Sequence, residues 1–391
     1  MVSSIRPETN YTAYLIEALQ RYYADKVEVL VYTEKDKLNL SVPLSNINLV
    51  WNRNWQYVFQ VLFRAKKDKV DAVHFQHEIN MYGGVSTALL FPVLVFLLRV
   101  FGFRPLVTAH AAIPIKLIDR RFLEVFNWPY PKLLTPVVKL IFPLVYFLIG
   151  LFAEKVIVHT QTIKNCLESD YHINGRKIVI IPHGVPDVVD EGKLLSGSDW
   201  RGRLIGKKII LYFGYLHKRK GVEYLLSAFS NLTNSFPDYL LVIAGGTIQE
   251  NYFNELKNLV TNLGIKDKVI FTGFIKTPEI SYLMYQCEFV ILPAIYSIAA
   301  SGPLAQVFAF EKPAIVTRIG SYAEEITDGV DGLLVEPGSV ESLVTGMRKM
   351  ITDEKLRGDI TSSVKVRHET RKWSKMAGLT LNTYSSLLNT R

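Results

Sequence analysis

Short apolar runs alternate with longer stretches of helical length along the 391 residues, and this alternation limits the folds that the chain can adopt. The runs are rich in β-branched residues and have the length of buried strands. Strands that alternate with helices form parallel sheets, because each right-handed crossover returns the chain to the same end of the sheet. The pattern therefore predicts an α/β fold of doubly wound parallel sheets.

The expected strands fall into two series. The first series is Val27–Tyr32, Ala72–Phe75, Leu106–Ala109, Val156–His159 and Ile178–Pro182. The second series is Lys208–Phe213, Leu240–Ala244, Val269–Thr272, Phe289–Leu292, Ala314–Thr317 and Gly332–Val335. A polar stretch near 190–206 separates them, and the length of the chain fits two domains. We expect a first domain at 1–200, a second at 201–372, and a helix at 373–391 that packs back on the first domain.

Composition narrows the classes of function. A chain that is 49% hydrophobic and 21% charged is neither disordered nor a coiled coil. Its two cysteines, Cys166 and Cys287, exclude a disulfide scaffold and a Cys-rich zinc site. The net charge of +9 allows an anionic partner. The basic residues are dispersed and form no nucleic-acid recognition motif, so we expect no nucleic acid among the partners.

The loop Gly214–Gly221 carries the clearest chemical signal. It follows an expected strand, precedes an expected helix, and contains four consecutive basic or ionisable residues, namely His217, Lys218, Arg219 and Lys220. Glycine allows a ligand to approach the backbone, and a helix start offers free N–H groups. These parts suit a pyrophosphate, although a solvated basic loop would have the same composition.

A second loop follows the strand that ends at Leu292. Small residues lead into Ser301-Gly302-Pro303, and serine followed by an early proline marks the start of a helix. This arrangement places another helix N-terminus at the carboxyl end of a parallel strand, where ligands of such sheets bind. The alternative is an ordinary connecting loop.

These loops belong to an ordered series of motifs. The series is Gly214…Lys220-Gly221, Ala244-Gly245-Gly246, Phe271-Thr272-Gly273-Phe274, Ser301-Gly302, Gly320…Glu324, Asp328-Gly329 and Gly332–Val335. In the first half, His74–Glu78, Thr108-Ala109-His110 and Ile181–Val185 add to it. The series resembles the retaining glycosyltransferases of group 1, family four, over nearly the whole chain.

This resemblance implies a GT-B fold, in which two Rossmann-like domains face each other across a cleft. It implies transfer of a sugar, a hexose in the first instance, from a nucleotide-sugar donor with retention at the anomeric carbon. The donor is a substrate, and neither a cofactor nor a metal is expected. Lys220 and His110 would be the catalytic residues, with Lys220 on the donor diphosphate and His110 facing the sugar.

The resemblance also implies binding residues. The donor would contact Gly214, His217, Lys218, Arg219, Ser301, Gly302, Gln306 and Glu324. The acceptor would contact His74, Gln76 and His77. Structural alternatives remain for single residues, because a histidine at a strand end can cap a loop and Glu324 can be a surface carboxylate.

Several positions depart from the family pattern. Ile298 and Gln306 stand where the family often has two glutamates, and His217 stands where arginine is common. An isoleucine cannot hydrogen-bond a sugar, whereas the amide of Gln306 can hydrogen-bond a ribose. Arg6–Asn10 replaces a glycine-rich loop. An alternative function is therefore a non-catalytic protein that binds a sugar nucleotide or a partner on the same fold.

Two apolar segments of the first domain, at 85–104 and 132–153, concern the acceptor. Each contains about 14 consecutive uncharged residues, whereas a spanning helix needs about 20. They are buried core helices or helices that lie in a membrane interface beside flanking lysines and arginines. The second interpretation favours a polyprenyl-linked saccharide acceptor and a peripheral enzyme on an anionic cytoplasmic leaflet. No signal-peptide pattern opens the sequence, so the cytoplasm is the expected compartment.

Overall fold

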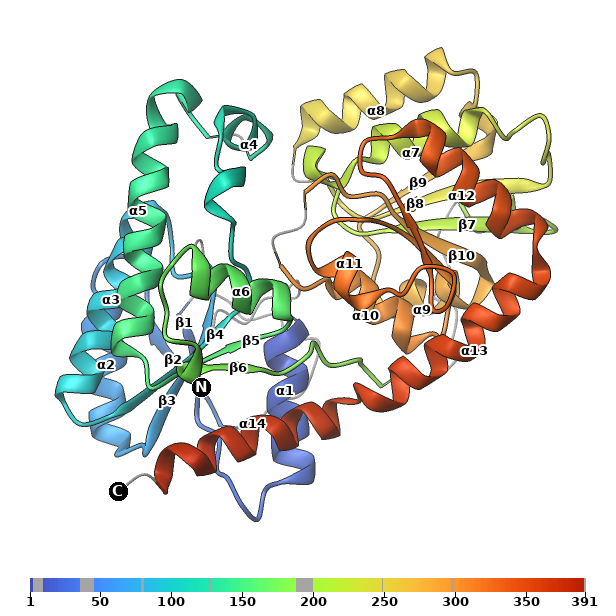
Figure 1. Cartoon of the computed structure of the whole chain (residues 1–391). Coiled ribbons are helices and arrows are strands. Elements are labelled where there is room, and N and C mark those ends of the chain that lie inside the picture. Colours follow the sequence, from blue (N-terminus) through green and yellow to red (C-terminus); the bar gives the residue numbers. More distant parts are fainter. Residues whose placement is uncertain are drawn as a thin grey trace. The chain divides into compact units, whose positions relative to one another are not determined.

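The computed structural model describes residues 1–2, 10–35, 46–78, 81–126, 128–187, 200–247, 249–296 and 299–389. It divides the chain into two compact units (Figure 1). Unit 1 is built mainly from Met1–Gly184 and Arg371–Arg391, and unit 2 mainly from Val185–Ser297 and Ser301–Thr370. The expected boundary at 190–206 lies partly outside the described residues.

Unit 1 contains parallel strands, and helices connect the successive strands from β2 to β6. The strands are β1 (Val31–Glu34), β2 (Ile47–Trp51), β3 (Ala72–His77), β4 (Arg104–Ala109), β5 (Lys155–Val158) and β6 (Ile178–Ile180). Val2 pairs in parallel with Tyr32 of β1 and with Phe75 of β3, so it joins the pair β1-β2 to the sheet β3-β4-β5-β6. Among the described residues, the segment before α1 therefore joins the sheet through isolated bridges at Val2.

Helices cover this sheet. They are α1 (Asn10–Tyr22), α2 (Tyr57–Asp68), α3 (Val85–Val100), α4 (Arg120–Val125), α5 (Pro131–Phe152), α6 (Gln161–Ser169) and α14 (Trp373–Leu388). The C-terminal helix α14 packs along α1 within unit 1 (Figure 1). Trp373 at its start stacks on Tyr14, and Tyr23 donates a hydrogen bond to the Ser374 carbonyl at 3.1 Å. The end of the chain thus completes the core of unit 1.

Unit 2 is a single six-stranded parallel sheet. Its strands are β7 (Lys208–Phe213), β8 (Tyr239–Ala244), β9 (Val269–Gly273), β10 (Cys287–Leu292), β11 (Ala314–Thr317) and β12 (Leu333–Val335), in the order β12-β11-β10-β7-β8-β9. The direction of winding reverses between β7 and β10, and ligands bind at such a switch point outside the carboxyl ends of the strands. The carboxyl ends of β7 and β10 therefore carry the candidate site.

In the described part of unit 2, seven helices pack on the sheet. They are α7 (Val222–Ser230), α8 (Glu250–Asn262), α9 (Thr277–Gln286), α10 (Gly302–Ala309), α11 (Gly320–Glu325), α12 (Val340–Thr352) and α13 (Glu354–Thr370). A large buried cluster of aliphatic and aromatic side chains lies between these helices and the strands. The sheet therefore offers a rigid base for the loops at its carboxyl edge.

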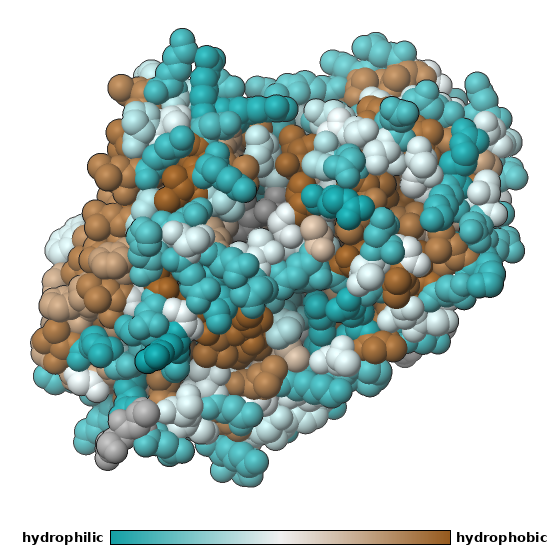
Figure 2. All heavy atoms as spheres, in the orientation of Figure 1, coloured by the Kyte–Doolittle hydropathy of each residue, from teal (hydrophilic) through white to brown (hydrophobic). Residues whose placement is uncertain are grey.

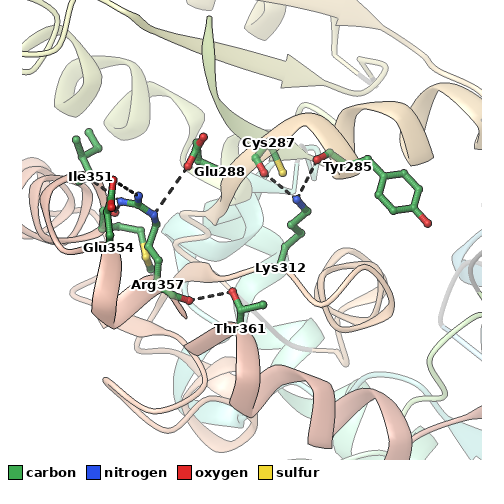
Figure 3. A network of polar contacts seen from close by, with 9 residues as sticks. Tyr285, Cys287, Glu288, Lys312, Ile351, Glu354, Arg357 and Thr361 are labelled. Atoms are coloured by element: carbon green, nitrogen blue, oxygen red, sulfur yellow. Dashed lines mark hydrogen bonds and ion pairs between the residues drawn. The ribbon is translucent and has the colours of Figure 1, made fainter. Parts of the chain in front are cut away.

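Two half-buried cations fix the amino-terminal end of β10 (Figure 3). Lys312 donates hydrogen bonds to the carbonyl oxygens of Tyr285 and Cys287, each at 3.0 Å, where α9 ends. Arg357 of α13 donates to the Ile351 carbonyl at 2.8 Å, and its Nε lies 3.9 Å from Glu288. Cations stabilise the carbonyl ends of helices. These contacts anchor β10 from α9, α12 and α13.

The sequence misplaced several elements. It missed β2, a short strand with Asn48 inside it and a half-exposed pattern, which is typical of an edge strand. It placed β1 about four residues too early, whereas the second apolar segment, at 132–153, coincides with α5 to within one residue at each end. The helix α5 has 22 residues. Pro131 lies in its first turn, where proline is tolerated, and Pro136 and Pro143 lie inside the helix. The six strands of unit 2 lie within two residues of the expected ones.

Candidate functional site

The loops after β7 and β10 are fastened to each other in unit 2. The Arg219 carbonyl accepts hydrogen bonds from the backbone N–H of Ile295 at 2.9 Å and of Tyr296 at 3.3 Å. Gly221 has φ +65°, and a Cβ built there would lie 2.3 Å from the Pro293 carbonyl oxygen. Gly214, directly after β7, has φ +143°. Only glycine allows this close approach at no cost in backbone strain.

Lys220 lies in a narrow pocket at this junction. The pocket is lined by Tyr212, Phe213, Lys220, Leu292, Pro293, Ala294 and Tyr322. No hydrogen bond or ion pair to the Lys220 ammonium occurs among the described residues. Burial, and next the charge of Arg219, lower the pKa of Lys220 to about 7. The site therefore holds an amine that is protonated in about half of the molecules near pH 7 and that has no anionic partner among the described residues.

The three residues before Lys220 have different roles. His217 Nδ1 accepts a hydrogen bond from the Arg219 backbone N–H at 3.1 Å and so begins the 3-10 turn η4 (Lys218–Lys220). Burial and the neighbouring Arg219 and Lys220 lower the pKa of His217 to about 4, so the ring is neutral at pH 7. Lys218 is exposed and lies 3.3 Å from Glu255. The Arg219 guanidinium has no partner among the described side chains.

The helix α10 begins beside this pocket. Ser301 is buried, accepts a hydrogen bond from the Leu304 N–H at 3.2 Å, and lies 3.1 Å from the Tyr322 hydroxyl. Gly302 is exposed and has open space where a Cβ would stand. Gln306 is half-buried on the same helix, one turn further on. Ser301, Gly302 and Gln306 thus lie together on the first two turns of α10.

Other positions singled out in the sequence lie apart from this group or outside the described residues. Glu324 is exposed near the end of the short helix α11, on the element that also carries Tyr322. Ile298 lies outside the described residues, and so does most of the segment Arg6–Asn10. The donor residues that the structure brings together are therefore those of the β7 loop and of α10.

Five of the eight histidines gather at the carboxyl edge of the unit 1 sheet. They are His74, His77, His110 and His159, which are buried, and His183, which is half-buried. Tyr11 of α1 packs against the rings of His110, His159 and His183 at centroid distances of 4.7, 4.8 and 5.2 Å. No group of three metal-ligating side chains among the described residues is arranged to hold a metal ion.

A hydrogen-bonded chain fixes the ring of His110. The Ile181 carbonyl can only accept, so His159 Nδ1, at 2.9 Å from it, carries a proton. A neutral His159 then accepts at Nε2 from His110 Nδ1, also at 2.9 Å. His110 Nε2, which then carries no proton, lies 2.8 Å from Gln76 Oε1, so this contact is a hydrogen bond when the Gln76 amide is turned to present its NH₂ group. A sugar hydroxyl would have to displace Gln76 or His159 to reach a ring nitrogen of His110.

The three predicted acceptor residues lie on β3 and are buried. His74 contacts the hydroxyls of Tyr384 and Thr108, both at 2.7 Å, and Gln76 contacts His110. His77 packs on Phe91 and Tyr146, and its ring makes no hydrogen bond among the described residues. His77 is therefore the member of the three with free hydrogen-bonding capacity. Binding of an acceptor by these residues stays a prediction.

Comparisons with known families agree with this geometry. A profile described as "Glycosyl transferases group 1" matches residues 201–367, and a profile described as "Glycosyltransferase Family 4" matches residues 9–188. The chain belongs to the group 1 glycosyltransferases. The two matches cover unit 2 and most of unit 1, so the family assignment extends over both sheets.

Individual relatives support the same assignment. An uncharacterized glycosyltransferase of Methanocaldococcus jannaschii is 30% identical over 46% of this chain and 45% of that protein. D-inositol 3-phosphate glycosyltransferase of an Arthrobacter species is 25% identical over 61% of this chain and 56% of its own. The matched region thus spans about half the length of the curated relatives.

Solved structures establish the GT-B fold. HepE of Anabaena, in complex with UDP and glucose, superposes with a TM-score of 0.73 at 18% identity and 98% coverage of both chains. Sucrose-phosphate synthase of Thermosynechococcus elongatus gives a TM-score of 0.75 at 18% identity, over 100% of this chain and 96% of its own. Two parallel, doubly wound sheets are what the alternating sequence pattern predicted.

Sequence reasoning missed two residues of this group 1 glycosyltransferase. Tyr322 lines the Lys220 pocket and contacts Ser301, and His159 holds His110. The sequence places His159 at the end of an expected strand, but only the neighbouring order of β4 and β5 brings it to His110. The signal was thus present, and the strand order was needed to interpret it.

The buried histidines predict that unit 1 loses stability in mild acid. Burial lowers the pKa of His74 to about 3 and that of His77 to about 4, against about 6.5 in an unfolded chain. A depressed pKa stabilises the fold above pH 6.5, and this contribution is lost as the pH falls toward the folded value. Each such histidine costs about 1.3 kcal/mol of unfolding free energy between pH 7.5 and pH 5.5. Urea unfolding at the two pH values measures the loss.

His77→Phe provides the matched test of this pH dependence. The phenyl ring can keep the contacts with Phe91 and Tyr146 but does not titrate. We expect the difference in stability between pH 7.5 and 5.5 to shrink by about 1.3 kcal/mol. An unchanged difference would show that His77 is not held neutral by burial.

Proposed function

We propose that this protein transfers a sugar from a nucleotide-sugar donor to a saccharide acceptor. The unpartnered Lys220 ammonium at the switch point of unit 2 is the observation that carries the proposal. A nucleoside diphosphate leaving group gains negative charge as its bond to the sugar breaks, and a preorganised cation stabilises that charge most where water is excluded. Arg219 and the start of α10 add a second cation and free backbone N–H groups.

We propose further that the reaction needs no metal and retains the anomeric configuration. Lys220 and Arg219 supply positive charge where other transferases use a divalent ion. The bond between the anomeric carbon and the diphosphate oxygen breaks, the acceptor oxygen bonds to that carbon on the same face, and its proton passes to the departing phosphate. Gln306 on α10 would hydrogen-bond the donor ribose, and His77 would contact the acceptor in unit 1.

The identity of the substrates remains part of the proposal. The structures of Anabaena HepE contain UDP, UDP and glucose, or UDP-glucose, which supports a nucleotide-sugar donor here. The apolar helices of unit 1 favour an acceptor saccharide on a lipid carrier at the cytoplasmic membrane face. A hexose is the donor sugar that we expect.

A panel of UDP-, GDP- and ADP-sugars tests this function. We expect saturable binding of one donor, slow hydrolysis of it without acceptor, and the same rates with added Mg²⁺ or with a chelator. Calorimetry and chromatographic detection of the released nucleoside diphosphate are the measurements.

A folded protein that binds none of these donors would contradict the transferase proposal. It would favour a non-catalytic protein on the same fold, with Ile298 and His217 as the first positions to examine. Binding without hydrolysis or transfer would point to the same alternative, with an intact donor site.

A further inference from the structure

The helix α5 of unit 1 has two opposite apolar stripes. One stripe is in the core and consists of Val138, Phe142, Tyr146 and Ile149. The other is exposed and consists of Leu133, Val137, Leu140, Leu144, Phe147 and Leu151, with Leu140 73% exposed. A helix of 22 residues with this hydropathy is long enough to span a membrane. Tyr146, however, donates a hydrogen bond to the Ala111 carbonyl at 2.9 Å, so one side of α5 is held along the domain.

The neighbouring helices continue the exposed stripe. On α3, which packs on α5, the exposed apolar residues are Leu89, Val93, Phe96 and Val100, one per turn. On the adjacent α2, Phe59 and Phe63 are exposed, and Trp55, in the turn before α2, is exposed four residues earlier. Phe96 contacts Phe152 at a centroid distance of 4.8 Å, and Lys66 lies 5.7 Å from the centre of the Phe101 ring. We call the exposed stripes of α2, α3 and α5 together the apolar face.

Figure 2 shows hydrophobic spheres gathered along the flank formed by α3 and α5. Isolated exposed hydrophobic side chains are common, whereas contiguous ones over three helices mark a binding surface. The apolar face belongs to unit 1 alone, so it is separate from the Lys220 site of unit 2.

The charge of these three helices indicates which kind of partner binds to the apolar face. The three helices carry six basic residues, Arg64, Lys66, Lys67, Arg99, Lys132 and Lys139. Their only acidic residue is Asp68, which is paired with Arg64 at 2.7 Å, and Arg99 is paired at 2.6 Å with Glu154, two residues after α5. An apolar surface bordered by cations and without a free carboxylate is complementary to anionic headgroups above hydrocarbon. The surface of an average protein carries charges of both signs and would not match this excess of positive charge.

We propose that α2, α3 and α5 form one membrane-docking face that lies in the interface of an anionic bilayer. Its apolar side chains enter the acyl boundary while Lys66, Lys132 and Lys139 contact headgroups. The helix α5 lies along the bilayer surface and does not cross it. The inference rests on the proposed function, because a lipid-linked acceptor explains why a transferase with a soluble donor needs the bilayer.

Flotation of the full-length protein with vesicles tests the face. We expect binding to vesicles of phosphatidylcholine mixed with phosphatidylglycerol, and weaker binding to phosphatidylcholine alone. Leu140→Glu/Leu144→Glu places two charges on exposed positions and should weaken binding by at least about tenfold. Lys132→Glu/Lys139→Glu should remove the preference for anionic vesicles. The matched control is Ile205→Glu/Val366→Glu, which alters residues of unit 2 that are 82% and 63% exposed and should leave binding unchanged.

Two further readouts make the result decisive. Donor hydrolysis without vesicles should be equal in all variants. If none of the variants hydrolyses a donor, the proposed function is contradicted, whereas the membrane-docking face is still tested by vesicle binding. Sedimentation should show a monomer without vesicles. Equal vesicle binding by the Leu140/Leu144 variant would overturn the proposal. So would a dimer that this variant converts to a monomer, since the face would then be a self-association surface.

Discussion

Replacing Lys220 by methionine is expected to lower sugar transfer by about 100- to 1,000-fold, the usual cost of removing one preorganised group that stabilises charge in a transition state. The methionine keeps the length of the aliphatic stem inside the pocket and removes only the ammonium. Because Lys220 has no anionic partner among the described residues, no ion pair of the fold is broken. Steady-state rates with the donor identified by the panel are the measurement.

Stability should change in the opposite direction. A cation with a pKa lowered by burial to about 7 is less stable in the fold than in water. Lys220→Met should therefore keep or raise the unfolding free energy while transfer collapses, as is typical of residues that are strained for function. Urea unfolding of the two proteins gives this comparison.

The same lysine should couple donor binding to a proton. Near pH 7 about half of the free protein carries the Lys220 proton, and a bound diphosphate raises this pKa, so binding takes up about half a proton. Affinity should level off below pH 7 and fall as the pH rises above it. Calorimetry in buffers of different ionisation enthalpy measures the uptake, which should vanish in Lys220→Met.

Lys218→Ala is the matched control for Lys220. Its side chain is exposed and paired with Glu255, and exposed ion pairs contribute little. We expect less than about a threefold change in transfer. Equal losses in the two variants would indicate a general effect of loop charge, and full activity of Lys220→Met would remove Lys220 from the diphosphate site.

The sequence predicts the donor site better than the acceptor site, for a physical reason. The donor loops follow β7 and β10 directly, so local signals of strand end, glycine and helix start locate Gly214, Lys220 and Ser301. Parallel strands then bring their carboxyl ends together whatever the detail of the helices.

The unit 1 site depends on contacts between distant segments. His74 lies against Tyr384, 310 residues later in the chain, and His110 lies against His159 on the next strand. No local pattern contains these pairs, and so His74, Gln76 and His110 seemed free to bind substrates. The burial of all three residues, and with it the lowered pKa values of His74 and His110, follows from the packing of α1 and α14.

Gly221→Ala is expected to lower the unfolding free energy of unit 2 by about 3 kcal/mol. Two effects add at this position, namely the strain of alanine in a left-handed backbone conformation and the clash of its Cβ with a neighbouring backbone carbonyl. Its φ is +65°, and the new Cβ would stand 2.3 Å from the Pro293 carbonyl oxygen. A carbonyl at the end of a central strand cannot rotate away as a side chain can. The β7 and β10 loops must therefore separate, and Lys220, the residue before Gly221, moves with them. Urea unfolding and donor affinity should both fall.

Gly264→Ala separates the two causes. Gly264 has nearly the same φ, +67°, but nothing lies within 4 Å of its new Cβ. This control should cost about 1 kcal/mol from backbone strain alone and leave donor affinity unchanged. If Gly221→Ala cost no more than Gly264→Ala, the two loops would not be in fixed contact. The close approach of Gly221 to Pro293 would then not be what holds Lys220 at the proposed diphosphate position.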